Sequence, residues 1–241
     1  MKITDYISYT IDRFPKGFVF TYVDFPAEVN QKEAIIKALN RMVAAGKIAK
    51  LSKGKYYKPE TTPFGILQPV RSQVVKDLLE ENGKTVGYLT GYSIYNSLGL
   101  TTQLSNVIQI GKNVVRPAFK RGQYTISFIK QKNIITKENI PLLQILDAIR
   151  YIQKIPDTTI SKSGKRLSVI LKNLSDTEKS SLVRLALKYP PSARALLGTL
   201  LDTIQADAVS QPLYNSLNPI TKYKLPGLKV AFPEADKWNF S

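Results

Sequence analysis

The segment between Asn30 and Lys58 constrains the fold more than any other part of the chain, because it joins a helical apolar repeat to a short basic hairpin. The repeat has the spacing of one helix face, and Gly46 follows it where helices commonly end. Residues 48–51 and 56–58 then favour two strands around a turn at 52–55, in which Gly54 supplies the turn conformation. The apolar residues of the repeat are Ile35, Ile36, Leu39, Met42 and Val43. A helix followed by such a hairpin is the order of a winged helix-turn-helix, which we predict for residues 1–60.

The remaining face of this helix is polar and basic. Asn30 and Glu33 have the spacing of a capping box, which would satisfy free amides at the start of the helix. No acid occurs between Arg41 and Lys58, although cations crowd this stretch. Crowded like charge favours a polyanionic partner, whereas the simpler alternative is an ordinary solvated face. The polar residues off the apolar stripe include Lys32, Lys37, Asn40 and Arg41, and the cations of the hairpin region are Lys47, Lys50, Lys53, Lys55 and Lys58.

The net charge points in the same direction. The chain has 35 lysines and arginines against 18 acids, a formal charge of +17, with 43% hydrophobic residues. An excess of this size favours nucleic acid, or less often an anionic membrane surface, although a merely basic soluble protein is the alternative. The hydrophobic content indicates a folded chain.

Several classes of chemistry are excluded by composition. The chain has no cysteine and no histidine, which removes disulfides, Cys/His zinc sites and His-based nucleophilic catalysis. No phosphate-binding glycine loop is present, and no pair of carboxylates has the spacing of an acid–base couple. We therefore expect no catalytic residues, no metal and no cofactor. A metal-dependent nuclease relying on Asp147 or Asp176 is the rival hypothesis. The N-terminus lacks a signal peptide and no apolar run could span a membrane, so a cytoplasmic protein is expected.

Beyond residue 60 the sequence predicts three further segments. Residues 61–69, rich in proline and threonine, are expected to be a linker. Residues 70–155 favour a mixed domain with a helix over 70–81, a short helix over 90–98 and strands at 107–110, 113–119 and 124–129. Residues 156–241 favour a polar loop at 157–166, helices over 175–188 and 192–204, and a tail anchored by Trp238 and Phe240. The predicted fold class is α+β, with a winged helix-turn-helix, a mixed middle domain with a small sheet, and a helical C-terminal part.

The middle domain carries a charge of one sign. Residues 82–137 contain no aspartate or glutamate. This bias favours a second phosphate-facing surface or a docking face for an acidic protein, unless it merely reflects the low frequency of acids in strands.

The chain resembles a known family. The strings RMVAAGKIAKLSKGKYY, PETTPFG and above all TGYSIYNSLGLTTQ from Thr90 to Gln103 look like the AbiEi-type antitoxins of bacterial type IV toxin–antitoxin (abortive infection) systems. The resemblance covers residues 1–155 and does not extend to the C-terminal helices.

The resemblance implies a function and a set of residues. Such antitoxins repress their own operon by binding inverted repeats as a monomer or weak dimer, and they counter a nucleotidyltransferase-like toxin in phage defence. By position, the recognition helix would use Lys32, Lys37, Asn40 and Arg41; the wing would use Lys47, Lys50, Lys53, Lys55 and Tyr56; and a secondary basic surface would comprise Lys112, Arg116, Lys120 and Arg121.

Arg41 and Asn40 are the residues that we expect at base edges, because arginine suits guanine and asparagine suits adenine in the major groove. The wing lysines are expected at phosphates. Two alternatives remain: a protein that neutralises its toxin by direct binding, and a generic DNA-binding regulator.

Overall fold

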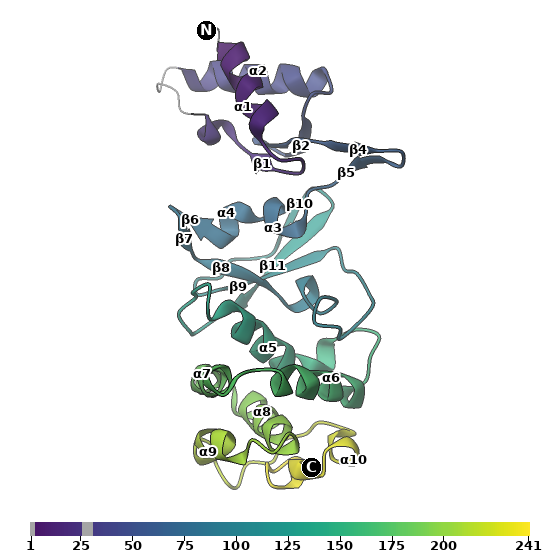
Figure 1. Ribbon diagram of the computed structural model, residues 1–241, viewed down its shortest axis with the longest axis vertical. Helices are drawn as coiled ribbons and strands as arrows, with labels where there is room; N and C mark the ends of the chain where they lie inside the picture. The colour runs from purple at the N-terminus through teal and green to yellow at the C-terminus, as the bar shows by residue number, and fades with distance from the viewer. Residues whose placement is uncertain (1–2, 26–30) are drawn as a thin grey trace. The chain divides into compact units, whose positions relative to one another are not determined.

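The computed structural model describes residues 3–25 and 31–241 and divides into two compact units, which are treated separately (Figure 1). The first unit comprises residues 1–79 and 119–124, and the second comprises residues 80–118 and 125–241. The fold is mixed α+β, as predicted, with small sheets and many helices. This division differs from the four segments expected from the sequence, because the middle segment is shared between the units and the second unit continues past residue 155.

The first unit contains an apolar core between helices and a three-stranded sheet. Its elements are α1 (Ile3–Arg13), β1 (Val19–Phe20), the 3-10 turn η1 (Tyr22–Asp24), α2 (Lys32–Ala44), β2 (Ala49–Ser52), β3 (Lys55–Tyr57), β4 (Glu60–Thr62), β5 (Gly65–Leu67), α3 (Arg71–Val74), α4 (Lys76–Leu79) and β10 (Phe119–Arg121). The strands β1, β3 and β2 pair antiparallel in that order. The core cluster joins Ile7 and Ile11 of α1 to Leu39 of α2 and Tyr56 of β3.

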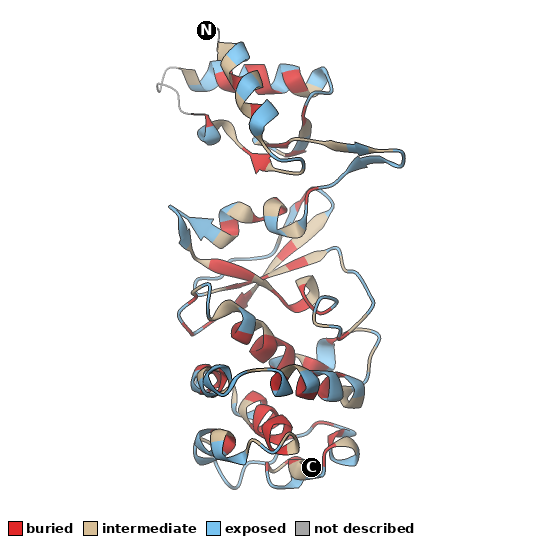
Figure 2. Cartoon of the chain, in the orientation of Figure 1, coloured by how far each residue is buried: buried red, intermediate tan, exposed pale blue. Residues whose placement is uncertain are grey.

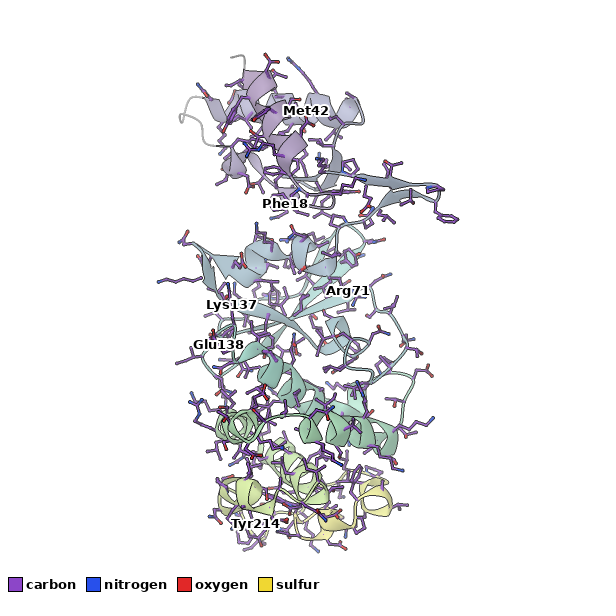
Figure 3. The ribbon with its side chains drawn as sticks, in the orientation of Figure 1. Phe18, Met42, Arg71, Lys137, Glu138 and Tyr214 are labelled. Carbon is purple, nitrogen blue, oxygen red and sulfur yellow. The ribbon has the colours of Figure 1, made fainter. Side chains whose placement is uncertain are left out.

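The apolar repeat predicted for α2 is confirmed. Ile35, Leu39 and Met42 are buried, while Ile36 and Val43 are half-buried at the edge of the stripe. Figure 2 shows the buried residues of α2 in red, and Figure 3 labels Met42 on this helix. The start of the helix is less well predicted. Asn30 lies outside the described residues, and Gln31, the residue before the helix, makes no side-chain capping bond.

The expected linker at 61–69 is a β-hairpin. Strands β4 and β5 pair antiparallel with Glu60 opposite Leu67, and the Thr62 hydroxyl closes the turn by donating to the carbonyl of Gly65. Phe64, in the turn, is fully exposed. The helix predicted over 70–81 is also wrong in detail, because α3 and α4 are two short helices.

The second unit packs helices on a small sheet. Its elements are β6 (Glu80–Glu81), β7 (Lys84–Thr85), β8 (Gly87–Thr90), η3 (Gly91–Ser93), β9 (Val107–Lys112), β11 (Tyr124–Lys130), α5 (Ile140–Arg150), η4 (Ile152–Lys154), α6 (Ile160–Lys172), α7 (Asp176–Ala186), α8 (Pro191–Thr203), α9 (Asp207–Asn215), α10 (Leu228–Ala231) and η5 (Pro233–Asp236). Strand β9 lies between β11 and β8, parallel to β11 and antiparallel to β8. Ile126 is opposite Ile108 in this register.

One large core holds the second unit together. It runs from Tyr88 of β8 through helices α5 to α8 to Phe240 near the C-terminus. Trp238 is 1% exposed, and its indole N–H donates to Asp202 at 2.9 Å, which confirms the predicted anchoring of the tail. The capping box predicted at Ser175 and Glu178 is also confirmed.

Three sequence predictions fail in this unit. Residues 113–118 form no strand, and β9 ends before them. The expected helix over 90–98 is a 3-10 turn, η3, followed by further turns. The expected loop at 157–166 is largely helix α6, whose first turn is capped by the Thr159 hydroxyl accepting from the amide of Lys162. Among the described residues, no helix combines the length and the apolar character needed to cross a membrane.

Candidate nucleic-acid interface

The exposed face of α2 carries the residues predicted to face DNA. Lys37, Asn40 and Arg41 are exposed. Asn40 and Arg41 follow Lys37 by three and four residues, so the three side chains lie on one side of the helix. Glu33 precedes them on the same face, in the first turn, where a carboxylate stabilises the helix dipole. Lys32 is also exposed, but its ammonium lies 4.7 Å from the centre of the Tyr22 ring, which ties it to η1. The structure therefore groups three of the four predicted residues.

A hydrogen bond from a core residue orients one of these side chains. The Tyr56 hydroxyl of β3 donates to the Asn40 Oδ1 at 3.0 Å, while the Tyr56 ring is buried in the core of the unit. Burial raises the pKa of the Tyr56 hydroxyl, so it remains a donor. The bond orients the Asn40 amide and leaves its NH₂ group and a second lone pair of Oδ1 for another partner.

Tyr56 does not lie on the surface of the hairpin as predicted. It was expected among the hairpin residues that touch DNA, but it is 3% exposed. Its ring lies in the core, where it stacks on Phe20, the residue opposite it in the β1–β3 pairing. It contacts the exposed face of α2 through its hydrogen bond to Asn40.

The hairpin lysines differ in whether their ammonium groups have partners within the first unit. Lys50 and Lys53 are exposed, and Gly54 in the turn has a φ of 72°, a conformation that glycine adopts easily. Lys47 instead donates to Ser8 and to Asp12 at 3.2 Å, so it fastens the end of α2 to α1. Lys55 is 18% exposed and forms a salt bridge with Asp77 at 3.1 Å. Two of the four predicted lysines thus already have partners in the first unit.

Asp77 forms salt bridges with two cations, Lys55 and Arg121, that were predicted to lie on exposed surfaces. Arg121 is 7% exposed, and its guanidinium makes two bonds to the Asp77 carboxylate, at 2.6 and 3.0 Å, and one to the Val74 carbonyl at 2.8 Å. Burial alone would raise the pKa of Asp77, but the hydrogen bonds and charges of Arg121 and Lys55 outweigh it and lower that pKa. Arg121 is a structural ion-pair partner, and its assignment to a basic surface is corrected accordingly.

The other three members of the predicted secondary surface are divided between the units. Lys120 is exposed in the first unit. Lys112 and Arg116 belong to the second unit, where Lys112 is half-buried and the Arg116 guanidinium lies 5.5 Å from the centre of the Phe128 ring. The structure of each unit by itself does not bring the four residues into one group.

The second unit contains a buried polar cluster that sequence reasoning did not find. Asp147 of α5 is fully buried and accepts hydrogen bonds from the hydroxyls of Tyr88, Thr90 and Tyr189 at 2.7 to 2.9 Å. The Gln131 amide donates to both tyrosine hydroxyls at 2.8 Å. Burial raises the pKa of Asp147, an effect that the three hydroxyl donors oppose.

The carboxylates do not form a metal site in the part of the chain that the structure describes. No group of three histidine, cysteine, aspartate or glutamate residues there is placed to hold an ion. Asp147 is enclosed, whereas the Asp176 side chain is 98% exposed at the start of α7. The nuclease hypothesis therefore gains no support from these two residues.

Comparisons with known proteins place the chain in a family. It belongs to the family described as a family of unknown function (DUF6088), which matches residues 6–177. Among solved structures, it is similar to the crystal structure of the Rv2827c protein from Mycobacterium tuberculosis, with a TM-score of 0.61 and 15% sequence identity over 98% of this chain and 90% of that chain. At this identity the likeness concerns the fold alone. A search of curated proteins gives no match.

Proposed function

We propose that the first unit is a winged helix-turn-helix that binds double-stranded DNA, with α2 as recognition helix and the β2–β3 hairpin as wing. The order of α1, β1, α2 and an antiparallel hairpin supports this assignment, because a recognition helix followed by a hairpin is how this motif reaches a groove and the adjacent backbone. The observation that carries the proposal is the exposed face of α2, where Arg41 stands beside an Asn40 held in one orientation by Tyr56.

The roles of the residues follow from their chemistry. Arg41 can bind guanine and Asn40 can bind adenine through two hydrogen bonds each, and each such pair contributes about 1–3 kcal/mol of discrimination. Lys37, Lys50 and Lys53 are exposed and suited to phosphates. Lys47 and Lys55 contribute to the positive field but are held by Asp12 and Asp77.

The biological role that we propose is that of an antitoxin that represses its own operon. The resemblance of residues 1–155 to AbiEi-type antitoxins supports it, as does the charge of +17. The partner would be a toxin of the nucleotidyltransferase type, and the DNA would be inverted repeats upstream of the operon. Co-expression with the neighbouring toxin tests this role: rescue of growth supports it, whereas toxicity unchanged by this protein contradicts it. Co-purification of the two proteins would favour neutralisation by direct binding.

DNA binding is tested by selecting duplexes from a random pool with the full chain and measuring affinity by fluorescence anisotropy. Arg41→Ala should weaken binding to the selected duplex by about 5- to 150-fold, the equivalent of about 1–3 kcal/mol, and change binding to a scrambled duplex far less. Lys50→Ala with Lys53→Ala should weaken both and reduce the slope of log K against log salt by about 1.8.

The matched control for the lysine pair is Lys165→Ala with Lys172→Ala, two exposed lysines of α6 in the second unit. This pair removes the same charge and should leave the salt slope within error of the unchanged protein. Equal loss on selected and scrambled DNA for Arg41→Ala, or equal slopes for both lysine pairs, contradicts the proposal.

A further inference from the structure

The second unit contains a pocket of about 690 Å³ that the DNA-binding proposal does not use. It is formed by the end of β11, the end of α5, the connection between α7 and α8, and the first turn of α8. Its size falls within the range of about 300–1,000 Å³ that is typical of small-molecule sites.

Five cations line this pocket and no acid does. They are Lys130, Lys132, Arg150, Lys188 and Arg194. Four of the side chains are exposed, and Arg194 is half-buried. Within residues 3–25 and 31–241, none of the five has a salt bridge, in contrast to Lys47 and Lys55 of the first unit. Cations that converge on a concave surface repel one another and raise the local concentration of an anion.

Arg194 is a pocket cation that the fold holds in place. Its Nη1 donates to the Ser216 carbonyl at 2.9 Å, which holds the guanidinium in place. Its Nε is buried without a hydrogen-bond partner among the described residues. A buried donor left unpaired is unfavourable, and a guanidinium with free N–H groups is well suited to the oxygens of a phosphate.

The buried polar groups at the inner part of the pocket are already hydrogen-bonded within the unit. Gln131 and Tyr189 both line it and are buried, and the Gln131 amide donates to the Tyr189 hydroxyl. Tyr189 in turn donates to Asp147, which is fully buried and does not line the pocket. These groups preform the pocket, and the cations around it, which have no salt bridge within the described residues, can bind a ligand.

We infer that this pocket binds a small anion with two or more phosphate groups, of the class of a nucleoside triphosphate. A concave site gathers its cations around one compact ligand, whereas a nucleic-acid backbone distributes its charges along its length. Leu187, Pro190 and Pro191 supply apolar lining that can contact a nucleoside. All lining residues lie in the second unit, so this inference does not depend on the first-unit residues proposed to bind DNA.

The test is isothermal titration calorimetry of the full chain, in EDTA, with tripolyphosphate, ATP, inorganic phosphate and a single-stranded dT oligonucleotide. Tripolyphosphate and ATP should bind, and inorganic phosphate should bind at least tenfold more weakly. Lys132→Ala with Lys188→Ala should weaken tripolyphosphate binding at least tenfold. The control pair Lys165→Ala with Lys172→Ala should change it less than twofold. Arg194→Gln, with circular dichroism to verify folding, should also weaken it tenfold or more.

The two polyphosphates distinguish the sources of the ligand. Equal affinity for both indicates recognition of phosphate alone, whereas tighter binding of ATP indicates that the nucleoside contributes, and either result supports the inference. Absence of binding by both, or equal weakening by the pocket pair and the control pair, overturns it. An oligonucleotide that binds through Lys132 and Lys188 more tightly than tripolyphosphate overturns it in favour of a nucleic-acid site.

Discussion

Replacing Tyr56 by phenylalanine removes one oxygen atom from the core of the first unit and should change how the protein selects DNA. The hydroxyl donates to Asn40 Oδ1 at 3.0 Å, and the ring is buried and stays in place without it. Asn40 is exposed, so water replaces the lost donor, and stability should fall by no more than about 1 kcal/mol.

The larger effect is expected in specificity. A well-placed asparagine discriminates its base by about 1–3 kcal/mol. An amide that can rotate freely about its terminal bond loses part of this discrimination energy. We expect Tyr56→Phe to weaken binding to the selected duplex about three- to tenfold and to leave binding to a scrambled duplex unchanged. Asn40→Ala should weaken selected binding about 5- to 150-fold, the full discrimination of about 1–3 kcal/mol.

The two substitutions should not add. In the Asn40→Ala background, Tyr56→Phe has no amide left to orient and should have no further effect on affinity. Competition anisotropy at one fixed salt concentration gives all four affinities, and urea unfolding gives the four stabilities. Additive losses in affinity, or an equal loss on scrambled DNA, would refute the idea that Tyr56 positions Asn40 for base contact.

Two further predictions concern the interiors of the units. The folded-state pKa of Asp77 is lowered, so its contribution to stability is complete above about pH 4 and is lost as pH falls through that lowered value. Asp77→Asn should therefore flatten the loss of stability below about pH 4 seen in urea unfolding, and should destabilise the protein at pH 7 by leaving Arg121 without its counterion; an unchanged acid profile contradicts this. In the second unit, a Cβ added to Gly198 would lie 2.2 Å from the Trp238 ring, so Gly198→Ala should destabilise by about 1–3 kcal/mol despite the better helix propensity of alanine. Trp238 is the one tryptophan of the chain, and its emission should shift to the red; an unshifted spectrum with unchanged stability contradicts this.

The features predicted correctly from the sequence are those set by local chemistry. Residues 32–44 form a helix because Ile35, Leu39 and Met42 recur at helical spacing and bury one face. Helix α7 begins where Ser175 and Glu178 form their reciprocal cap. The exposure of Arg41 and Lys53 follows from the same periodicity and from the turn chemistry of Gly54.

The features missed depend on residues far apart in the chain. Helix α6 was taken for a loop because Gly164 and its serine neighbours have low helix propensity, but Gly164 packs against the Phe232 ring, where a Cβ would lie 2.6 Å from Phe232 Cε2. Arg121 was placed on the surface because its partner, Asp77, is distant in sequence. No local pattern predicts such a pair.

The same obstacle hid the cluster around Asp147. Tyr88 and Thr90 of β8, Gln131 and Tyr189 come from three separate stretches of the chain, and each of them is unremarkable in its own sequence context. A single buried aspartate among apolar helix residues was the one available signal.

The ion pair between Arg121 and Asp77 has a practical consequence for dissecting the molecule. Residues 119–124 return to the first unit after an excursion of the chain through residues 80–118. A truncation after residue 79 would therefore deprive Asp77 and Val74 of the guanidinium they bind. An N-terminal fragment that ends at residue 79 is therefore an incomplete folding unit, and the part proposed to bind DNA is best studied by substitution within the intact chain.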